Sequence, residues 1–148
     1  MKLDRDGVME VLPHRGVMLM VDGIEELDYG KRVVGYRDVG AGEFWCDGHF
    51  PDRPILPGAL IIEMMAQVCA FLFVGEEGRE RKIPYIAKVE EVKFLDKVYP
   101  NSRLVVEALF DAEGAGFVRA KCTALCGGKP AARGKLTCRL SGDGRTEE

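Results

Sequence analysis

The 148-residue sequence predicts an α+β fold in which one long central helix is wrapped by a curved antiparallel β-sheet. Residues 58–75 are nearly all apolar, which is typical of a helix enclosed by the protein. Residues 84–140 instead alternate apolar and polar side chains between turn sequences, as antiparallel strands do. No linker or repeat divides the chain. Residues 1–140 are therefore expected to form a single domain, and residues 141–148 have the composition of a disordered tail.

The first elements are expected to be a short helix before Pro13 and then a hairpin. The segments "MLMVDGIEEL" and "RVVGYRDV" flank the turn sequence "DYGK", which indicates two paired strands. The central helix follows, with Pro57 in its first turn, where the fixed φ of proline suits a helix start. Gly75 is expected to end this helix. Because Glu63 and Gln67 interrupt its apolar surface, the segment is not predicted to span a membrane.

The last half of the chain predicts an antiparallel meander of long strands. Its turn sequences are "YPNS" at 99–102, "EGAG" at 113–116 and "GGKP" at 127–130. In "FVRAKCTALC" every second residue from Val118 to Cys126 is apolar and lies on one face, whereas Arg119 and Lys121 lie on the other. Cys122 and Cys126 are therefore expected in the core and not as metal ligands.

Composition excludes several classes of function. A net charge of −3 argues against binding nucleic acid or an anionic membrane by bulk electrostatics. Five cysteines without metal-type spacing are best explained as reduced thiols. The first ten residues carry five charged side chains, unlike a signal peptide, so a cytoplasmic location is expected.

The segment "GHFPDRPILPGALIIEMMAQ", residues 48–67, resembles the signature of the FabZ-type (3R)-hydroxyacyl-acyl carrier protein dehydratases, a family with the hot-dog fold. The resemblance continues through "LPHRGVMLMVD" and "VEEVKFLDKVYPNSRLVVE" and spans about residues 11–140. It implies removal of water from a 3-hydroxyacyl thioester to give a trans-2-enoyl thioester, with no metal and no other cofactor. The fold that it implies, one helix wrapped by a sheet, agrees with the patterning.

Four residues carry the implied chemistry. His49 matches the base of the family and Glu63 its acid, and dehydration requires one of each. The apolar surroundings of Glu63 are expected to raise its pKa, so that the carboxyl can donate a proton. Gly58, in the first helical turn, offers a backbone N–H to the thioester oxygen. Gln67 lies one turn beyond Glu63 and is expected to orient its carboxyl.

Two other residues are expected to have structural roles, and two other classes of function stay open. His14, before an apolar strand, is expected to be structural, and Tyr85 is expected to be a core aromatic residue. A hot-dog thioesterase would use a carboxylate to activate water and would not need His49 together with Glu63. A non-catalytic acyl-binding subunit would not need to keep both ionisable groups.

The resemblance also implies partners. The substrate would be a 3-hydroxyacyl phosphopantetheine thioester carried by acyl carrier protein. The chain would form a homodimer, or a hexamer of three dimers, with His49 of one protomer meeting Glu63 of the other. Because the carrier is acidic, a basic surface is expected for it, and residues 115–148 offer seven cations against three carboxylates: Arg119, Lys121, Lys129, Arg133, Lys135, Arg139 and Arg145 against Asp143, Glu147 and Glu148.

Overall fold

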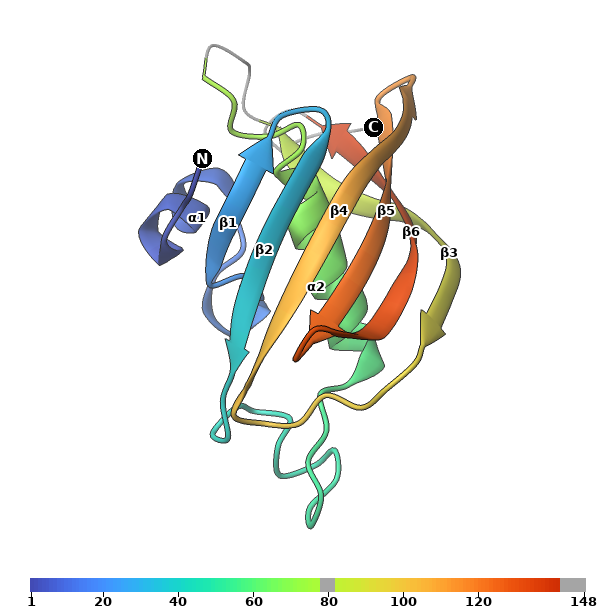
Figure 1. The fold of residues 1–148 in the computed structure, drawn as a ribbon. Helices are drawn as coiled ribbons and strands as arrows, with labels where there is room; N and C mark the ends of the chain where they lie inside the picture. Colours follow the sequence, from blue (N-terminus) through green and yellow to red (C-terminus); the bar gives the residue numbers. More distant parts are fainter. Residues whose placement is uncertain (78–81, 142–148) are drawn as a thin grey trace.

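A six-stranded antiparallel sheet wraps around one central helix in the computed structural model, which describes residues 1–77 and 82–141 (Figure 1). The sheet order is β1-β2-β4-β5-β6-β3. The helix α2 packs against strands β2 to β6, and this arrangement confirms the predicted α+β fold. In chain order the elements are α1 (Arg5–Val11), the 3-10 turn η1 (Gly16–Met18), β1 (Gly23–Asp28), β2 (Arg32–Val39), α2 (Gly58–Ala70), β3 (Ile83–Phe94), β4 (Ser102–Gly114), β5 (Phe117–Cys126) and β6 (Lys129–Ser141).

The hairpin β1–β2, the short helix before Pro13 and the three turns of the last half lie where the sequence predicts them. The meander is only partly correct, because β4, β5 and β6 are consecutive neighbours but β3 pairs with β6 and not with β4. The connection 95–101 passes below the start of α2, where the Leu56 amide donates to the Val98 carbonyl at 2.8 Å (Figure 1). This crossing carries the chain from one margin of the sheet to its middle.

The central helix is shorter than its apolar run. Pro57 is its N-cap residue, but the α-helix ends at Ala70 and not at Gly75. Beyond Ala70 the backbone tightens, since the amides of Phe71 and Leu72 donate to carbonyls three residues earlier. Gly75 ends this tightened turn with a φ of +93°, a conformation that favours glycine.

The core lies between α2 and the concave face of the sheet. Strand β5 presents Val118, Ala120, Cys122 and Ala124 to it as buried side chains, whereas Cys126 is half-buried. All five cysteines are free thiols, and burial raises the pKa of Cys122 to about 12, which keeps this thiol protonated. Among the described residues, no helix has the length and apolarity needed to cross a membrane.

The two margins of the sheet differ. At one margin, β1 has a register shift between Ile24 and Glu26, and Leu3 forms a short bridge to Ile24. At the other margin, β3 shifts register twice, and Glu91 in the second shift has a φ of +52°. The expected tail lies almost entirely outside the described residues, because β6 runs to Ser141.

Candidate active site

Glu63 lies in a cavity of about 410 Å³ between α2, β3 and the segment that precedes β1. Its side chain is 22% exposed, so the apolar helix does not enclose it completely. The cavity is lined by both polar and apolar side chains: Pro13, His14, Met18, Glu63, Ala66, Gln67, Ile83, Pro84, Tyr85, Ile86 and Cys138. A carboxyl group at the wall of such a cavity can reach a bound ligand.

Gln67 contacts the carboxyl of Glu63 from one helical turn further along α2. Its Nε2 donates to Glu63 Oε2 at 2.6 Å and to the Met18 carbonyl at 2.7 Å. Its Oε1 accepts from the Met20 amide at 2.8 Å. Because Gln67 is buried, with 1% of its surface exposed, its amide has little freedom to turn. The orientation of Glu63 is thus tied to the backbone of residues 18–20.

His14 is a second polar neighbour of Glu63. Its Nε2 lies 3.6 Å from Glu63 Oε2, and both side chains line the same cavity. Burial is the main cause that lowers the pKa of His14, while the carboxyl of Glu63 acts in the opposite direction. Its Nδ1 is buried without a hydrogen-bond partner among the described residues. The sequence does not predict this proximity, since nothing local connects residue 14 to residue 63.

His49 lies in the loop between β2 and α2, half-buried, and the backbone fixes its position. Its amide donates to the Trp45 carbonyl at 2.9 Å, and its carbonyl accepts from the Ile55 amide at 2.8 Å. Its ring stacks on Phe50 with 4.4 Å between centroids. Its Nδ1 lies 3.0 Å from the Ile55 carbonyl oxygen, which can only accept. The proton of the neutral ring is therefore on Nδ1, and Nε2 carries the lone pair.

An ion pair anchors the loop that carries His49. Arg37 on β2 binds Glu43, and their side chains are only 13% and 16% exposed. Glu43 also accepts from the Gly40 amide at 2.6 Å and from Trp45 Nε1 at 3.3 Å. Arg37 in turn donates to the Leu19 carbonyl at 3.2 Å. The loop that carries His49 and the Gln67 side chain that contacts Glu63 are thus both hydrogen-bonded, through Arg37 and directly, to the backbone of residues 18–20.

The structure of one chain does not bring His49 and Glu63 together. His49 is not among the residues that line the Glu63 cavity, and its ring contacts are with Ile55 and Phe50. Gly58 begins α2, and its amide has no acceptor among the described residues. A Cβ on Gly58 would lie 2.8 Å from the ring of Phe94. Glycine at this position therefore allows the Phe94 ring of the same chain to pack closely against the start of α2.

Tyr85 is not the core residue that the sequence suggested. It is 45% exposed and lines the Glu63 cavity from β3, together with Ile86. Cys138, on β6, faces the same cavity and was expected only as a thiol. Strand alternation alone does not predict that Tyr85 and Cys138 line one cavity, because it does not predict that β3 pairs with β6. Among the described residues, no cluster of His, Cys, Asp and Glu side chains suits a metal ion.

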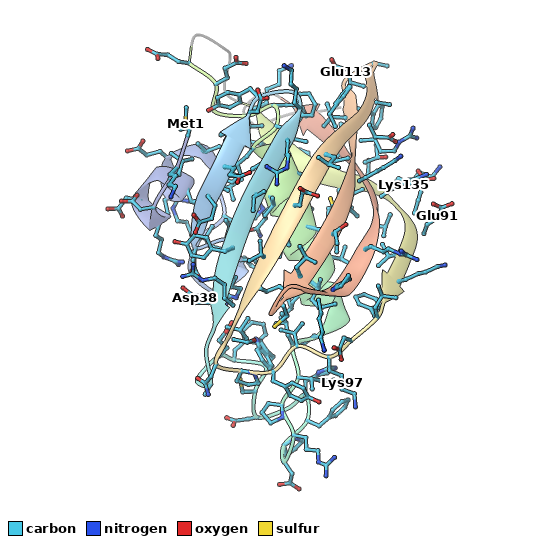
Figure 2. The ribbon with its side chains drawn as sticks, in the orientation of Figure 1. Met1, Asp38, Glu91, Lys97, Glu113 and Lys135 are labelled. Carbon is cyan, nitrogen blue, oxygen red and sulfur yellow. The ribbon has the colours of Figure 1, made fainter. Side chains whose placement is uncertain are left out.

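Three of the described cations proposed for carrier binding, Arg119, Lys121 and Lys135, have acidic partners. Arg119 binds Asp111 at 2.6 Å, and Lys135 lies 3.4 Å from Glu91 at the β3 margin (Figure 2). A hollow of about 570 Å³ beside the β3 bulge is lined by four cations, Lys93, Lys121, Arg133 and Lys135. Arg145 lies outside the described residues. This basic hollow is separate from the Glu63 cavity, with which it shares no lining residue.

Comparison with solved structures supports the fold. The chain superposes on "The Dehydratase Heterocomplex ApeI:P from Xenorhabdus doucetiae" with a TM-score of 0.78, covering 95% of this chain and 93% of that one at 18% identity. A hypothetical thioesterase from Streptococcus pneumoniae TIGR4, solved with coenzyme A, gives a TM-score of 0.59 at 12% identity and covers 80% of this chain and 84% of that one. At these identities the likeness concerns the hot-dog fold alone.

Sequence relatives identify the family. A 3-hydroxyacyl-[acyl-carrier-protein] dehydratase FabZ of Thermoanaerobacter sp. (strain X514) is 37% identical over 142 residues, which are 96% of this chain and 100% of the relative. The protein of the same name from Clostridium botulinum (strain Kyoto / Type A2) is 41% identical over 136 residues, 90% of this chain and 93% of the relative. The FabA-like domain matches residues 12–135. This chain therefore belongs to the FabA-like domain family and, within it, to the FabZ dehydratases.

Proposed function

We propose that this protein removes water from a 3-hydroxyacyl thioester, with His49 as the base and Glu63 as the acid. The observation that carries the proposal is the hydrogen bond of His49 Nδ1 to the Ile55 carbonyl. It leaves Nε2 of a neutral imidazole free to accept a proton, which is the state that a general base needs near neutral pH. Family membership supports the same reaction.

The proton balance of the reaction uses both residues. His49 Nε2 takes a proton from the carbon next to the thioester carbonyl, and the electrons of that C–H bond form the new double bond. The carbon–oxygen bond of the 3-hydroxyl breaks, and the oxygen leaves as water after accepting a proton from Glu63. The next turnover requires His49 to lose its proton and Glu63 to regain one.

The geometry around Glu63 suits a proton donor. Both of its polar neighbours, Gln67 and His14, approach Oε2. Oε1 has no hydrogen bond from the described residues, so it is the oxygen that can carry the proton to the substrate. The amide of Gly58 has no acceptor among the described residues and lies at the positive end of the α2 dipole, so it is the donor proposed for the thioester oxygen as negative charge develops there.

The site is proposed to form between two chains. His49 stands apart from the Glu63 cavity in one chain, so a partner must supply the base if the two act on one substrate. Strand β3 offers a surface for such a partner, since its free margin carries Tyr85, Ile86 and Val89, which are 45%, 41% and 42% exposed. Apolar side chains beside an unpaired strand favour addition of a second copy. A homodimer, or a hexamer of three dimers, is the assembly proposed.

The substrate is proposed to arrive on acyl carrier protein, in the cytoplasm. The relatives are named as dehydratases of 3-hydroxyacyl groups on acyl carrier protein. The four cations of the basic hollow are candidates for its acidic surface, because opposite charge accelerates encounter between proteins. Replacing Lys121 and Arg133 together should then lower kcat/KM for the carrier-bound substrate more than kcat/KM for a free thioester.

The test compares His49→Ala and Glu63→Gln with wild type on a 3-hydroxyacyl thioester, by following the absorbance of the enoyl thioester. Loss of a proton-transfer group typically costs about 10²- to 10⁴-fold in rate, and each variant should lose that much. Thermal unfolding of each variant should remain cooperative. Wild-type protein that released free thiol from a saturated acyl thioester, but formed no enoyl thioester, would identify a thioesterase instead. Glu63→Gln with wild-type turnover would refute the assignment of the acid.

A further inference from the structure

We propose that His14 is a positioning residue of this reaction, which donates from Nε2 to Glu63 Oε2 and so keeps Oε1 turned toward the substrate. The inference rests on the proposed function and adds a residue to it. Its first support is distance, because His14 Nε2 is 3.6 Å from Glu63 Oε2. This is longer than a hydrogen bond, but contacts around catalytic groups commonly shorten when substrate binds.

Hydrogen bonds fix the backbone around His14 and so hold its ring beside Glu63. Arg15 donates to the carbonyls of Met9 and Leu12 at 2.8 and 2.7 Å and to the carbonyl of His14 itself at 2.6 Å. These bonds hold the turn between α1 and η1. The ring of His14 is thereby placed against the cavity wall, with only 20% of its side chain exposed.

The tautomer of His14 follows from its surroundings. Nδ1 is buried and has no partner among the described residues, whereas Nε2 faces a carboxylate oxygen that can accept. A buried N–H without an acceptor is rarer and more costly than a buried lone pair, so the proton belongs on Nε2. The two histidines of this chain should then be neutral in opposite tautomers, with His49 protonated on Nδ1 and His14 on Nε2.

Gln67 alone does not fix the carboxyl of Glu63. A single hydrogen bond to Oε2 leaves the group free to rotate about that contact. A second donor on the same oxygen, from a different part of the chain, removes that freedom. The remaining titratable groups at this cavity wall are Tyr85 from β3 and Cys138 from β6, and neither forms a hydrogen bond with Glu63.

The first measurement is independent of activity. Two-bond ¹⁵N–¹H correlation spectra of the wild-type imidazoles, at about pH 8 where a neutral ring is expected, report the tautomer of each ring, and the His14→Gln variant assigns the signals. The expected result is an Nε2–H ring for His14. An Nδ1–H ring for His14 would overturn the inference, while an Nδ1–H ring for His49 would leave the proposed function standing.

The second measurement is kinetic and uses three variants. His14→Leu fills the space without a donor, His14→Gln restores a donor, and Val17→Ala changes the same segment at an exposed position outside the cavity. A misplaced catalytic group can cost about 10²-fold, so kcat of His14→Leu should fall by up to about that factor with little change in KM. His14→Gln should recover most of kcat, and Val17→Ala should equal wild type.

The outcomes separate the two proposals. His14→Leu with wild-type kcat, in a protein that dehydrates its substrate, overturns the role of His14 and leaves the proposed function intact. His14→Gln as slow as His14→Leu also overturns it, since a donor at this position would then be insufficient. Wild-type protein unable to dehydrate any 3-hydroxyacyl thioester overturns the proposed function together with the inference built on it.

Discussion

At the scale of single residues, the side-chain amide of Gln67 is tightly constrained. It makes three hydrogen bonds while it is almost completely buried. The sequence could predict its contact with Glu63, because residues four apart on a helix are neighbours. It could not predict the bonds to Met18 and Met20, which depend on how a distant segment lies across the helix. The same limit applies to His14, whose proximity to Glu63 also depends on how that distant segment lies.

Replacing Gln67 by Leu should damage both stability and turnover. The Met20 amide would lose its partner in a buried position, and leaving a buried donor unsatisfied costs about 1–3 kcal/mol. Urea unfolding of Gln67→Leu should therefore show a lower midpoint, and kcat should fall because Glu63 loses the hydrogen bond from Gln67 Nε2. Gln67→Glu is the matched variant, with the same shape and a second carboxylate beside Glu63, and it should also be impaired. Unchanged urea midpoints in both variants would contradict this account.

At the scale of elements, the loop before α2 is held by the ion pair of Arg37 and Glu43. The sequence does not predict this pair, since a charged residue in a strand and another in a turn are both common. The structure buries them together, and the loop that they anchor carries the backbone contacts of His49. By contrast, Pro57 and the apolar run after it predicted the start of α2 to within one residue, since Pro57 is the N-cap residue and Gly58 begins the helix. Its end was not predicted correctly, because the apolar run continues past the point where the backbone tightens.

Arg37→Met should destabilise the protein by about 3 kcal/mol, because it leaves the carboxylate of Glu43 in a poorly solvated position without its cation. It should also lower kcat more than it raises KM, since the displaced group is the base. Arg37→Lys keeps the charge but loses the forked geometry and should be milder in both measurements. Urea unfolding and steady-state kinetics of the two variants provide the comparison. Equal behaviour of Arg37→Met and wild type would show that the ion pair does not hold the loop.

At the scale of the whole molecule, the fold was predictable because its periodicities are strong. A helix apolar on all sides must be enclosed, and long alternating strands are the natural enclosure. The position of β3 was not predictable, since a strand alternation does not state which strand is its neighbour. Placing β3 beside β6 is what brings Tyr85 and Ile86 to the Glu63 cavity. The part of the site contributed by β3 therefore required the structure.

Co-expression of His49→Ala and Glu63→Ala chains should restore activity that neither has alone. If base and acid come from different chains, each mixed dimer has one site with both lesions and one with neither. Random assortment makes about half of the dimers mixed, so about a quarter of wild-type activity should return. Distinct affinity tags on the two chains allow the mixed dimers to be purified and assayed. Inactive mixed dimers would show that both groups of each site come from one chain.

The irregular margins of the sheet bear on aggregation. A regular exposed strand is a template on which further chains can add without limit. In β3 the row of backbone groups is broken by Pro84, which has no N–H, and again at Glu91 with its positive φ, while Lys88 and Lys93 add charge. The opposite margin, β1, is bulged and is bridged by Leu3. Any pairing along β3 is therefore short and self-limiting, and the growth of a cross-β fibre from the folded state is blocked at both ends of the sheet.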